Sequence, residues 1–248
     1  MVGADGRAFI DLHCHTSASF DSLSDPLAVL RAAARRGLTH LAITDHDRID
    51  AALRVRDAAP AGLTVLVGEE VRTTDGDLIC VFLERAIPPG LSPGDAIAAA
   101  REQGALVGIP HPFDRLRGSL LNDTRLVALA DQVDWVETWN ARVIDPRGNE
   151  RAAEFARLHD LPGVAVSDAH SLLEVGVAST SLEGDPATSA GLLAALASAR
   201  LLPGRASYLA RLITPVSKLV QRARGNGRVR PSGPGGESSV TEHAGVDR

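Results

Sequence analysis

Along most of the chain, short apolar runs alternate with alanine-rich stretches whose apolar residues recur at helical spacing. A short apolar run followed by such a stretch predicts a βα unit, and a series of these units predicts a parallel sheet. We therefore expect an α/β domain without internal repeats. Its predicted strands are Phe9–His13, Leu41–Thr44, Val65–Gly68, Leu78–Leu83, Leu106–Ile109, Trp135–Thr138, Val164–Ser167 and Val177–Thr180.

Local signals mark where the helices begin and end. Gly37 and Gly104 stand where helices should end, just ahead of the next strand. Asp75-Gly76 indicates a tight turn within a hairpin at Val71–Leu83, which interrupts the βα rhythm. Three helices are expected to begin where a capping side chain precedes a proline, at Asp25-Pro26, Ser92-Pro93 and Asp185-Pro186.

The segment 205–224 has a pattern of its own. Its apolar stripe consists of Tyr208, Leu209, Leu212, Ile213, Val216, Leu219 and Val220. The other face is basic, with Arg205, Arg211, Lys218, Arg222 and Arg224. We expect Thr214-Pro215 to start a second helix and to bend the stripe. Two interpretations stay open: a closing helix packed on the domain, which we prefer, and peripheral attachment to an anionic surface or partner.

Residues 1–204 thus form the predicted domain, 205–224 an amphipathic helical segment, and 225–248 a low-complexity tail that we expect to be disordered. The net charge is −5, which argues against general nucleic-acid binding. Cys14 and Cys80 are too few for a disulfide framework, so we expect reduced thiols and a cytoplasmic protein. The sequence shows no signal-peptide pattern and no apolar run near the roughly 20 residues of a membrane span. The oligomeric state is not predicted.

Histidines and carboxylates gather where the predicted strands end. Five of the eight histidines lie there, together with Asp45, Glu70, Glu137 and Asp168. In a barrel of βα units the C-terminal strand ends form the site. The pair His13-x-His15 points both imidazoles to one face, with Cys14 on the opposite face as a packing residue. The pattern predicts a site for more than one divalent metal ion.

Five ordered motifs carry a resemblance to a known family. They are Asp11-Leu-His13-x-His15-Thr16, Thr44-Asp45-His46-Asp47, Gly68-Glu-Glu70, His111-Pro112 and Ser167-Asp168-Ala169-His170. Together they resemble the polymerase and histidinol phosphatase (PHP) family, over about residues 8–181. The resemblance implies a distorted seven-stranded, TIM-like (β/α) barrel. It also implies metal-dependent hydrolysis of phosphate esters at two or three ions, for which Mn²⁺, Fe²⁺ and Zn²⁺ are the candidates.

The resemblance also implies a ligand set. The first ion would take His13, His15, Glu70 and Asp168, and Glu70 would bridge to a second ion that also takes His111. Asp21, His46 and His170 would hold the third ion, with Asp21 one step later than in the commonest pattern. Asp77 stands where many members place a histidine for the second ion. We interpret Asp77 as a carboxylate ligand, the alternative being a polar residue of the Asp75-Gly76 turn.

The remaining polar residues of the motifs have separate expectations. Glu69 is expected to face solvent, because its neighbour Glu70 fills the motif position. Asp45 or Asp47 would orient the imidazole of His46, and His170 or Asp45 would protonate the leaving group. Glu137 and Asn140 would either support the ligands or touch the substrate. We expect at least one of Arg115, Arg117 and Arg142 to bind phosphate, each being otherwise a solvated surface charge.

The sequence therefore predicts a metal-dependent phosphoesterase that acts on a small phosphorylated metabolite or nucleotide through metal-activated water. One alternative is a 3′-5′ exonuclease-like phosphodiesterase, against which the acidic balance argues. Another is a metal-binding module without turnover, for which degraded ligand motifs would be the sign. Only Asp77 departs from the pattern.

Overall fold

A computed structural model describes residues 6–114 and 123–228 of the chain. Its strands are β1 (Arg7–Asp11), β2 (His40–Ile43), β3 (Thr64–Arg72), β4 (Asp77–Val81), β5 (Leu106–Ile109), β6 (Trp135–Asn140), β7 (Gly163–Val166), β8 (Ser179–Glu183) and β9 (Arg200–Leu202). Its α-helices are α1 (Pro26–Arg35), α2 (Asp50–Val55), α3 (Pro93–Arg101), α4 (Asp123–Leu129), α5 (Pro146–Leu158), α6 (Ser189–Leu196) and α7 (Tyr208–Ala223). Short 3₁₀ turns, η1 (Arg56–Ala58) and η2 (Ala130–Gln132), follow α2 and α4.

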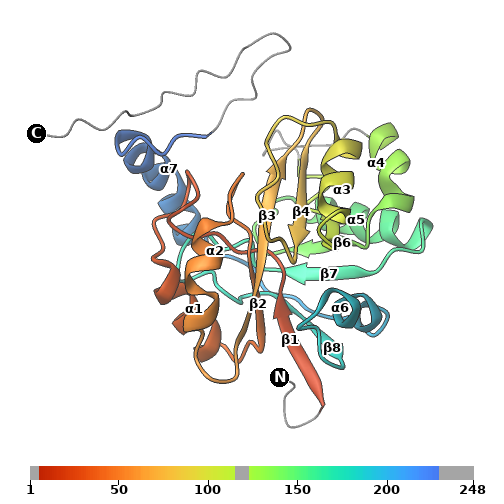
Figure 1. Cartoon of the computed structure of the whole chain (residues 1–248), viewed down its shortest axis with the longest axis horizontal. Helices are drawn as coiled ribbons and strands as arrows, with labels where there is room; N and C mark the ends of the chain where they lie inside the picture. Colours follow the sequence, from red (N-terminus) through yellow and green to blue (C-terminus); the bar gives the residue numbers. More distant parts are fainter. Residues whose placement is uncertain (1–5, 115–122, 229–248) are drawn as a thin grey trace, which may run out of the picture.

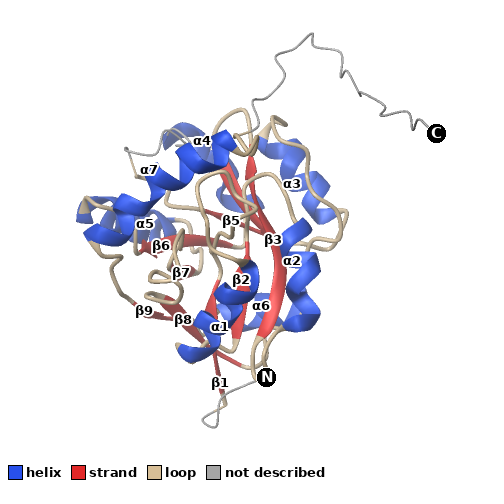
Figure 2. Cartoon of the chain, turned by 90° about the vertical axis from the view of Figure 1, so that its left-hand side faces the viewer, coloured by secondary structure: helices blue, strands red, loops and turns tan. Residues whose placement is uncertain are grey.

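The strands form one strongly curved sheet through the middle of the molecule, and the helices lie around it (Figures 1 and 2). Within the described ranges the sheet has nine strands in the order β7-β6-β5-β4-β3-β2-β1-β8-β9, rather than the seven that the resemblance implies. The neighbours β1, β2 and β3 pair in parallel, as do β5, β6 and β7. The hairpin strand β4 lies between these two sets and is antiparallel to both neighbours.

The sheet is nearly closed into a barrel between β7 and β8. The hydroxyl of Thr180 accepts a hydrogen bond from the Ala165 amide at 2.8 Å and donates to the Ala165 carbonyl at 3.0 Å. The side chain of Thr180 thus links β7 and β8 at the position where backbone hydrogen bonds would join the two strands in a closed barrel. The α/β class and the barrel-like shape agree with the prediction, while the extra strands come from β4 and from β9 at the sheet edge.

Two apolar layers hold this arrangement. The inner layer fills the barrel with side chains such as Ile10, Leu66, Val81 and Trp135. The outer layer lies between the sheet and the helices and contains Cys14, so this thiol is a packing residue on the face opposite to His13 and His15. Cys80 is buried in the same outer layer, and both cysteines are free thiols.

The helix boundaries agree with the sequence signals at two of three predicted starts. Asp25 caps α1 by accepting from the Ala28 amide at 2.9 Å, and Ser92 caps α3 by accepting from the Asp95 amide at 3.2 Å. The third prediction is wrong, since α6 begins at Ser189 with Thr188 as its cap. Asp185 instead accepts from the amide of Ala187 in a turn.

The C-terminal segment differs from its prediction in three ways. It forms a single helix, α7, which continues through Pro215 instead of restarting there. The side that faces the barrel consists of Ala210, Thr214, Ser217 and Gln221, so the apolar stripe points outward. Beyond the helix, Gly225–Arg228 belong to the predicted tail but pack against the domain, with the Asn226 amide donating to the Ala18 carbonyl at 2.9 Å. Residues 229–248 lie outside the described residues.

Of the described helices, none combines the length and the apolar composition that crossing a membrane requires.

Candidate metal centre

Backbone pairing beyond the strand ends brings the predicted ligands together. β1 ends at Asp11, but the chain goes on pairing, with the His15 amide donating to the Ala169 carbonyl and the Asp168 amide donating to the His13 carbonyl, each at 2.9 Å. His46 and Glu70 form an isolated bridge in the same way. Because these loops extend neighbouring strands, their side chains converge at one end of the barrel.

Three histidines are held in one tautomer by acceptors outside the centre. Nδ1 of His13 lies 2.6 Å from Oε1 of Glu137, and Nδ1 of His170 lies 2.9 Å from the Asp168 carbonyl. Nδ1 of His15 lies 3.0 Å from the hydroxyl of Ser19. A carboxylate and a carbonyl can only accept, and the Ser19 proton is directed to a carboxylate, so all three Nδ1 atoms donate. The Nε2 lone pairs are left to point inward, as metal-ligating histidines require.

The donor set fits divalent cations. Nε2 of His13 and Nε2 of His15 lie only 2.9 Å apart, close enough for one cation to bind both. Within the part of the chain that the structure describes, neither ring nitrogen of buried His111 has a hydrogen-bond partner, nor does Oδ1 of Asp21. Buried polar groups normally have partners, and buried carboxylates are paired or coordinate metal ions. Three groups of neighbouring donors could each hold an ion: His13, Glu70 and His111; His13, His15 and Asp168; and His15, Asp21, His46 and His170.

Glu70 stands at the centre of these groups. Its Oε2 lies 3.4 Å from Nε2 of His13, 3.3 Å from Nε2 of His15 and 3.1 Å from Nδ1 of His46. Its Oε1 lies 3.4 Å from Nε2 of His111. Burial raises the pKa of Glu70, but the histidines around it outweigh burial and hold this pKa well below its usual range. The carboxylate is therefore ionised and placed to bridge two ions.

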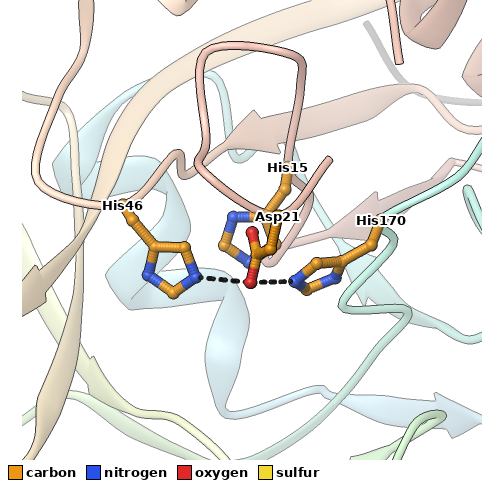
Figure 3. A group of neighbouring side chains, drawn as sticks. All are labelled: His15, Asp21, His46 and His170. Atoms are coloured by element: carbon orange, nitrogen blue, oxygen red, sulfur yellow. Dashed lines mark ion pairs between the residues drawn. The ribbon is translucent and has the colours of Figure 1, made fainter. Parts of the chain in front are cut away.

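The third group is drawn in Figure 3, where His46 and His170 flank the carboxylate of Asp21 and the ring of His15 lies next to it in the view. Oδ2 of Asp21 lies 3.2 Å from Nε2 of His170 and 3.5 Å from Nε2 of His46. Burial lowers the pKa of His170 to about 3, so this imidazole is neutral and able to ligate. Burial also lowers the pKa of His46, but Glu70 and Asp21 outweigh it and raise that pKa to about 9.

The loop that carries Asp21 is tied down from two sides. The hydroxyl of Ser22 donates to the His170 carbonyl at 3.0 Å. From the helix α7, the side-chain amide of Gln221 lies 2.7 Å, 3.0 Å and 2.7 Å from the carbonyls of Ser17, Ser19 and Ser22. This buried contact fixes the position of the loop that carries Asp21. Asp21 is the residue that stands one step later in the sequence than in the commonest pattern of the family.

Three acidic residues have hydrogen-bond partners that the sequence did not predict. Asp45 accepts from the Thr16 amide at 2.6 Å, the Thr16 hydroxyl at 2.7 Å and the Ser19 hydroxyl at 2.7 Å. It therefore supports His15 through Ser19. Glu69 is fully buried, not solvent-facing, and accepts from the Ile87 amide at 2.8 Å because β3 is covered on both faces. Asp47 accepts from the Arg72 amide at 2.8 Å and does not orient His46.

Asp77 faces the same pocket but has a different partner from the one predicted. Its two oxygens lie 3.1 Å and 3.5 Å from Nη2 of Arg228, which arrives from beyond α7. Among the described residues, no potential metal-binding group includes Asp77. Asp77 has this partner because the segment 225–228 packs against the domain. The low-complexity sequence of that segment did not predict an ordered structure.

Glu137 and Asn140 support the ligands instead of lining the pocket. Oε2 of Glu137 accepts from the backbone amide of His111 and from the side-chain amide of Asn140, both at 2.9 Å. The amide of Asn140 also donates to Oδ2 of Asp168 at 2.9 Å. Arg142 lines the pocket and is held by Glu174 and Thr214, each at 2.8 Å. Arg115 and Arg117 lie outside the described residues.

The pocket above the centre has a volume of about 280 Å³. One wall carries ligands, among them Asp21, His46, Glu70, His111 and His170. The same pocket is also lined by four basic side chains, Arg142, Arg211, Lys218 and Arg228. The sequence predicted the basic face of the segment 205–224. It contained no pattern that would place this face beside the metal centre.

The comparisons with known proteins establish the family. A model of the PHP domain matches residues 11–137, and a model of a PHP-associated region matches residues 146–201. The chain therefore belongs to the PHP domain family. Two uncharacterised proteins of Methanocaldococcus jannaschii are similar to it. One is 35% identical over 142 residues (53% of this chain, 81% of the relative), and the other is 32% identical over 170 residues (67% of each).

Solved structures show the same fold. A two-domain protein of Bacteroides vulgatus, described as containing a PHP-like metal-dependent phosphoesterase, superposes with a TM-score of 0.68 at 20% identity, over 82% of this chain and 68% of that one. A lesion-specific endonuclease of Pyrococcus furiosus has a TM-score of 0.59 at 17% identity, over 79% of this chain and 58% of the endonuclease.

Proposed function

We propose that this protein is a metal-dependent phosphoesterase that hydrolyses a small phosphorylated metabolite or nucleotide. The observation that carries the proposal is the pocket of about 280 Å³, which is lined both by histidines and carboxylates and by basic side chains. Arginine and lysine bind phosphate oxygens, and a divalent ion binds the same oxygens from the other side. The volume suits a small molecule rather than several nucleotides of a strand.

Divalent ions in the centre would lower the pKa of a bound water to about 7 and neutralise the charge on the phosphoryl oxygens. The chain's own residues do the rest. Glu137, Ser19 and the Asp168 carbonyl hold three imidazoles with Nε2 inward, so no reorientation is needed when substrate arrives. Arg142 is buried and held by Glu174, which makes it a rigid partner for a phosphate oxygen.

The basic residues of the pocket bear on the choice of substrate. Arg211 and Lys218 belong to α7, and Arg228 follows it, so one segment supplies three cations to the pocket. A phosphate ester with a second anionic group would have cationic partners for both groups. A long strand would need a basic groove that follows several phosphates.

The test is an assay of the Mn²⁺-loaded protein with phosphomonoesters, bisphosphates, cyclic phosphates and short oligonucleotides. We expect metal-dependent phosphate release from a small ester, near background in His170→Gln and unchanged in His159→Gln, which alters a half-buried histidine at the end of α5. Length-dependent degradation of oligonucleotides as the preferred reaction would instead support the exonuclease-like alternative. Full metal content with no turnover on any ester would support a non-catalytic module.

A further inference from the structure

The apolar side of helix α7 faces outward, which is the reverse of what a helix that only closes a domain would show. A surface helix ordinarily turns its apolar stripe toward the core. Here the inward side is small and polar, and the outward side is apolar. The exposed fractions are 78% for Tyr208, 76% for Leu209, 66% for Leu212, 57% for Val216 and 71% for Leu219. These five side chains define what we call the outer face of α7.

The inward side is held in place by specific contacts. Gln221 is bonded to the Asp21 loop, and Thr214 accepts from Arg142 at 2.8 Å. Turning the helix to bury its stripe would break these hydrogen bonds and leave buried carbonyls without donors, which is unfavourable. The exposure of the outer face is therefore a consequence of how α7 braces the site. In Figure 1 the helix lies at the outer edge of the molecule.

The charge around this face is of one sign. From Arg205 to Arg228 the sequence contains six basic residues and no acidic residue, although the whole chain has a net charge of −5. Arg222 and Arg224 are exposed at the end of the helix. An apolar stripe beside exposed basic residues, in a segment without acidic residues, is the combination that binds an anionic lipid interface.

We propose that the outer face of α7 docks on an anionic lipid surface, with the helix lying in the plane of the interface. The apolar side chains enter the boundary between headgroups and acyl chains, and the basic residues meet the anionic headgroups. This inference does not depend on the proposed reaction. Because the inner flank of the same helix carries Arg211 and Lys218, docking also places the pocket beside the membrane surface.

Two other occupants fit the observations less well. A second copy pairing through the same face would bring two rows of arginine and lysine together without acidic partners, which is repulsive. The residues 229–248 offer only Val229, Val240, Ala244 and Val246 as apolar side chains among glycine, serine and proline, too few to cover five exposed side chains.

The experiment is sedimentation of the full chain with vesicles of equimolar phosphatidylglycerol and phosphatidylcholine at low ionic strength. We expect binding that is lost on vesicles of phosphatidylcholine alone and that weakens as salt is added. The double variant Leu212→Gln/Leu219→Gln should bind about a hundredfold more weakly, at roughly tenfold for each leucine removed from the interface. The double variant Arg222→Gln/Arg224→Gln should bind more weakly on the anionic vesicles only.

The matched control is Leu158→Gln/Leu193→Gln, which changes two exposed leucines on α5 and α6 and should bind like the unaltered chain. No binding of the unaltered chain, even to pure phosphatidylglycerol, would overturn the proposal. Equal binding by the two leucine double variants would overturn it as well. A chain that is dimeric without lipid, and monomeric after Leu212→Gln/Leu219→Gln, would assign the face to a second copy.

Discussion

At the scale of single residues, the centre depends on side chains that would not themselves touch a metal ion. Glu137 accepts from His13 and from the His111 amide, and Asn140 links Glu137 to Asp168. Such partners fix the ring orientation and raise the basicity of the ligating nitrogen. The geometry of the donors is thus set by a buried network that joins the ends of four strands, β1, β5, β6 and β7.

Replacing Glu137 by glutamine tests this support. The shape is kept, but only one of the two amide heteroatoms can accept hydrogen bonds, whereas both carboxylate oxygens accept them now. We expect the affinity for Mn²⁺ to fall by about 10–100-fold, measured by calorimetric titration of chelator-treated protein. Glu154→Gln, on the exposed side of α5, is the control and should titrate like the unaltered chain. An unchanged affinity in Glu137→Gln would remove Glu137 from the centre's support.

His40 lies away from the centre, and its titration makes the free energy of unfolding depend on pH. Burial lowers the pKa of His40 to about 4, against the opposing effect of Asp185, whose Oδ1 lies 3.2 Å from Nε2. Between pH 4 and 6.5 the unfolded chain binds a proton here that the folded chain does not. This residue's contribution to the free energy of unfolding is therefore fully present above pH 6.5 and is lost as the pH falls toward 4, by up to about 1.4 kcal/mol per pH unit.

Urea unfolding of His40→Asn at pH 4.5 and 7 should show a smaller loss of stability on acidification than the unaltered chain shows. His159→Asn is the control, and its loss should match that of the unaltered chain. Equal losses for all three proteins would mean that His40 is protonated in the folded state.

At the scale of elements, α7 is both a wall of the pocket and a brace for the loop that carries Asp21. The contact rests on Gln221, whose amide serves carbonyls of three serines in that loop. A helix far along the chain thereby sets the position of a ligand near its beginning.

The variant Gln221→Leu removes these hydrogen bonds with little change in volume. We expect the free energy of unfolding to fall by about 1–3 kcal/mol and one equivalent of Mn²⁺ to bind more weakly, because Asp21 loses its fixed position. Gln132→Leu, at an exposed position of η2, is the control. A stability loss with unaltered metal stoichiometry and affinity would leave Gln221 a purely structural residue.

The short segment after α7 makes a second element-scale prediction. Asn226 contacts the Asp21 loop, and Arg228 pairs with Asp77 at 3.1 Å. A chain that ends at residue 228 should unfold at the same temperature as the full chain, whereas one that ends at residue 225 should be less stable by roughly 1–2 kcal/mol. Thermal unfolding of the two shortened chains measures the difference. Equal stability would mean that residues 226–228 contribute nothing to the fold.

At the scale of the whole molecule, the barrel gathers buried carboxylates and inward-facing lone pairs at one end. Without a cation this arrangement costs free energy, because like charges and lone pairs are held together away from water. Ions that bind the folded chain only must therefore raise its stability.

Chelation should lower the unfolding temperature and abolish phosphate release, and Mn²⁺, Fe²⁺ or Zn²⁺ should restore both. At a metal concentration of a hundred times Kd the gain in stability is about 2.7 kcal/mol for each site, readable by calorimetry. In His170→Gln the gain should shrink, and in His159→Gln it should remain. Turnover that survives complete metal removal, verified by elemental analysis, would contradict the proposed reaction.

Local patterns were sufficient for much of this molecule. All eight predicted strands have counterparts, since a buried strand needs a short apolar run wherever it lies. The histidines and carboxylates of the motifs meet at one end of the barrel, because residues that follow parallel strands share that end. These features depend on the periodicity of neighbouring residues, which a sequence displays directly.

Contacts between distant segments decided the rest. Glu69 is buried because the chain covers both faces of β3, and Asp77 pairs with a residue 151 positions away. The direction of the stripe on α7 follows from Gln221 and Thr214, whose hydrogen bonds hold the polar side of the helix against the barrel while five apolar side chains stay exposed. A pattern of apolar and polar positions shows that a helix has two faces. Only the surface against which the helix packs determines which face turns inward.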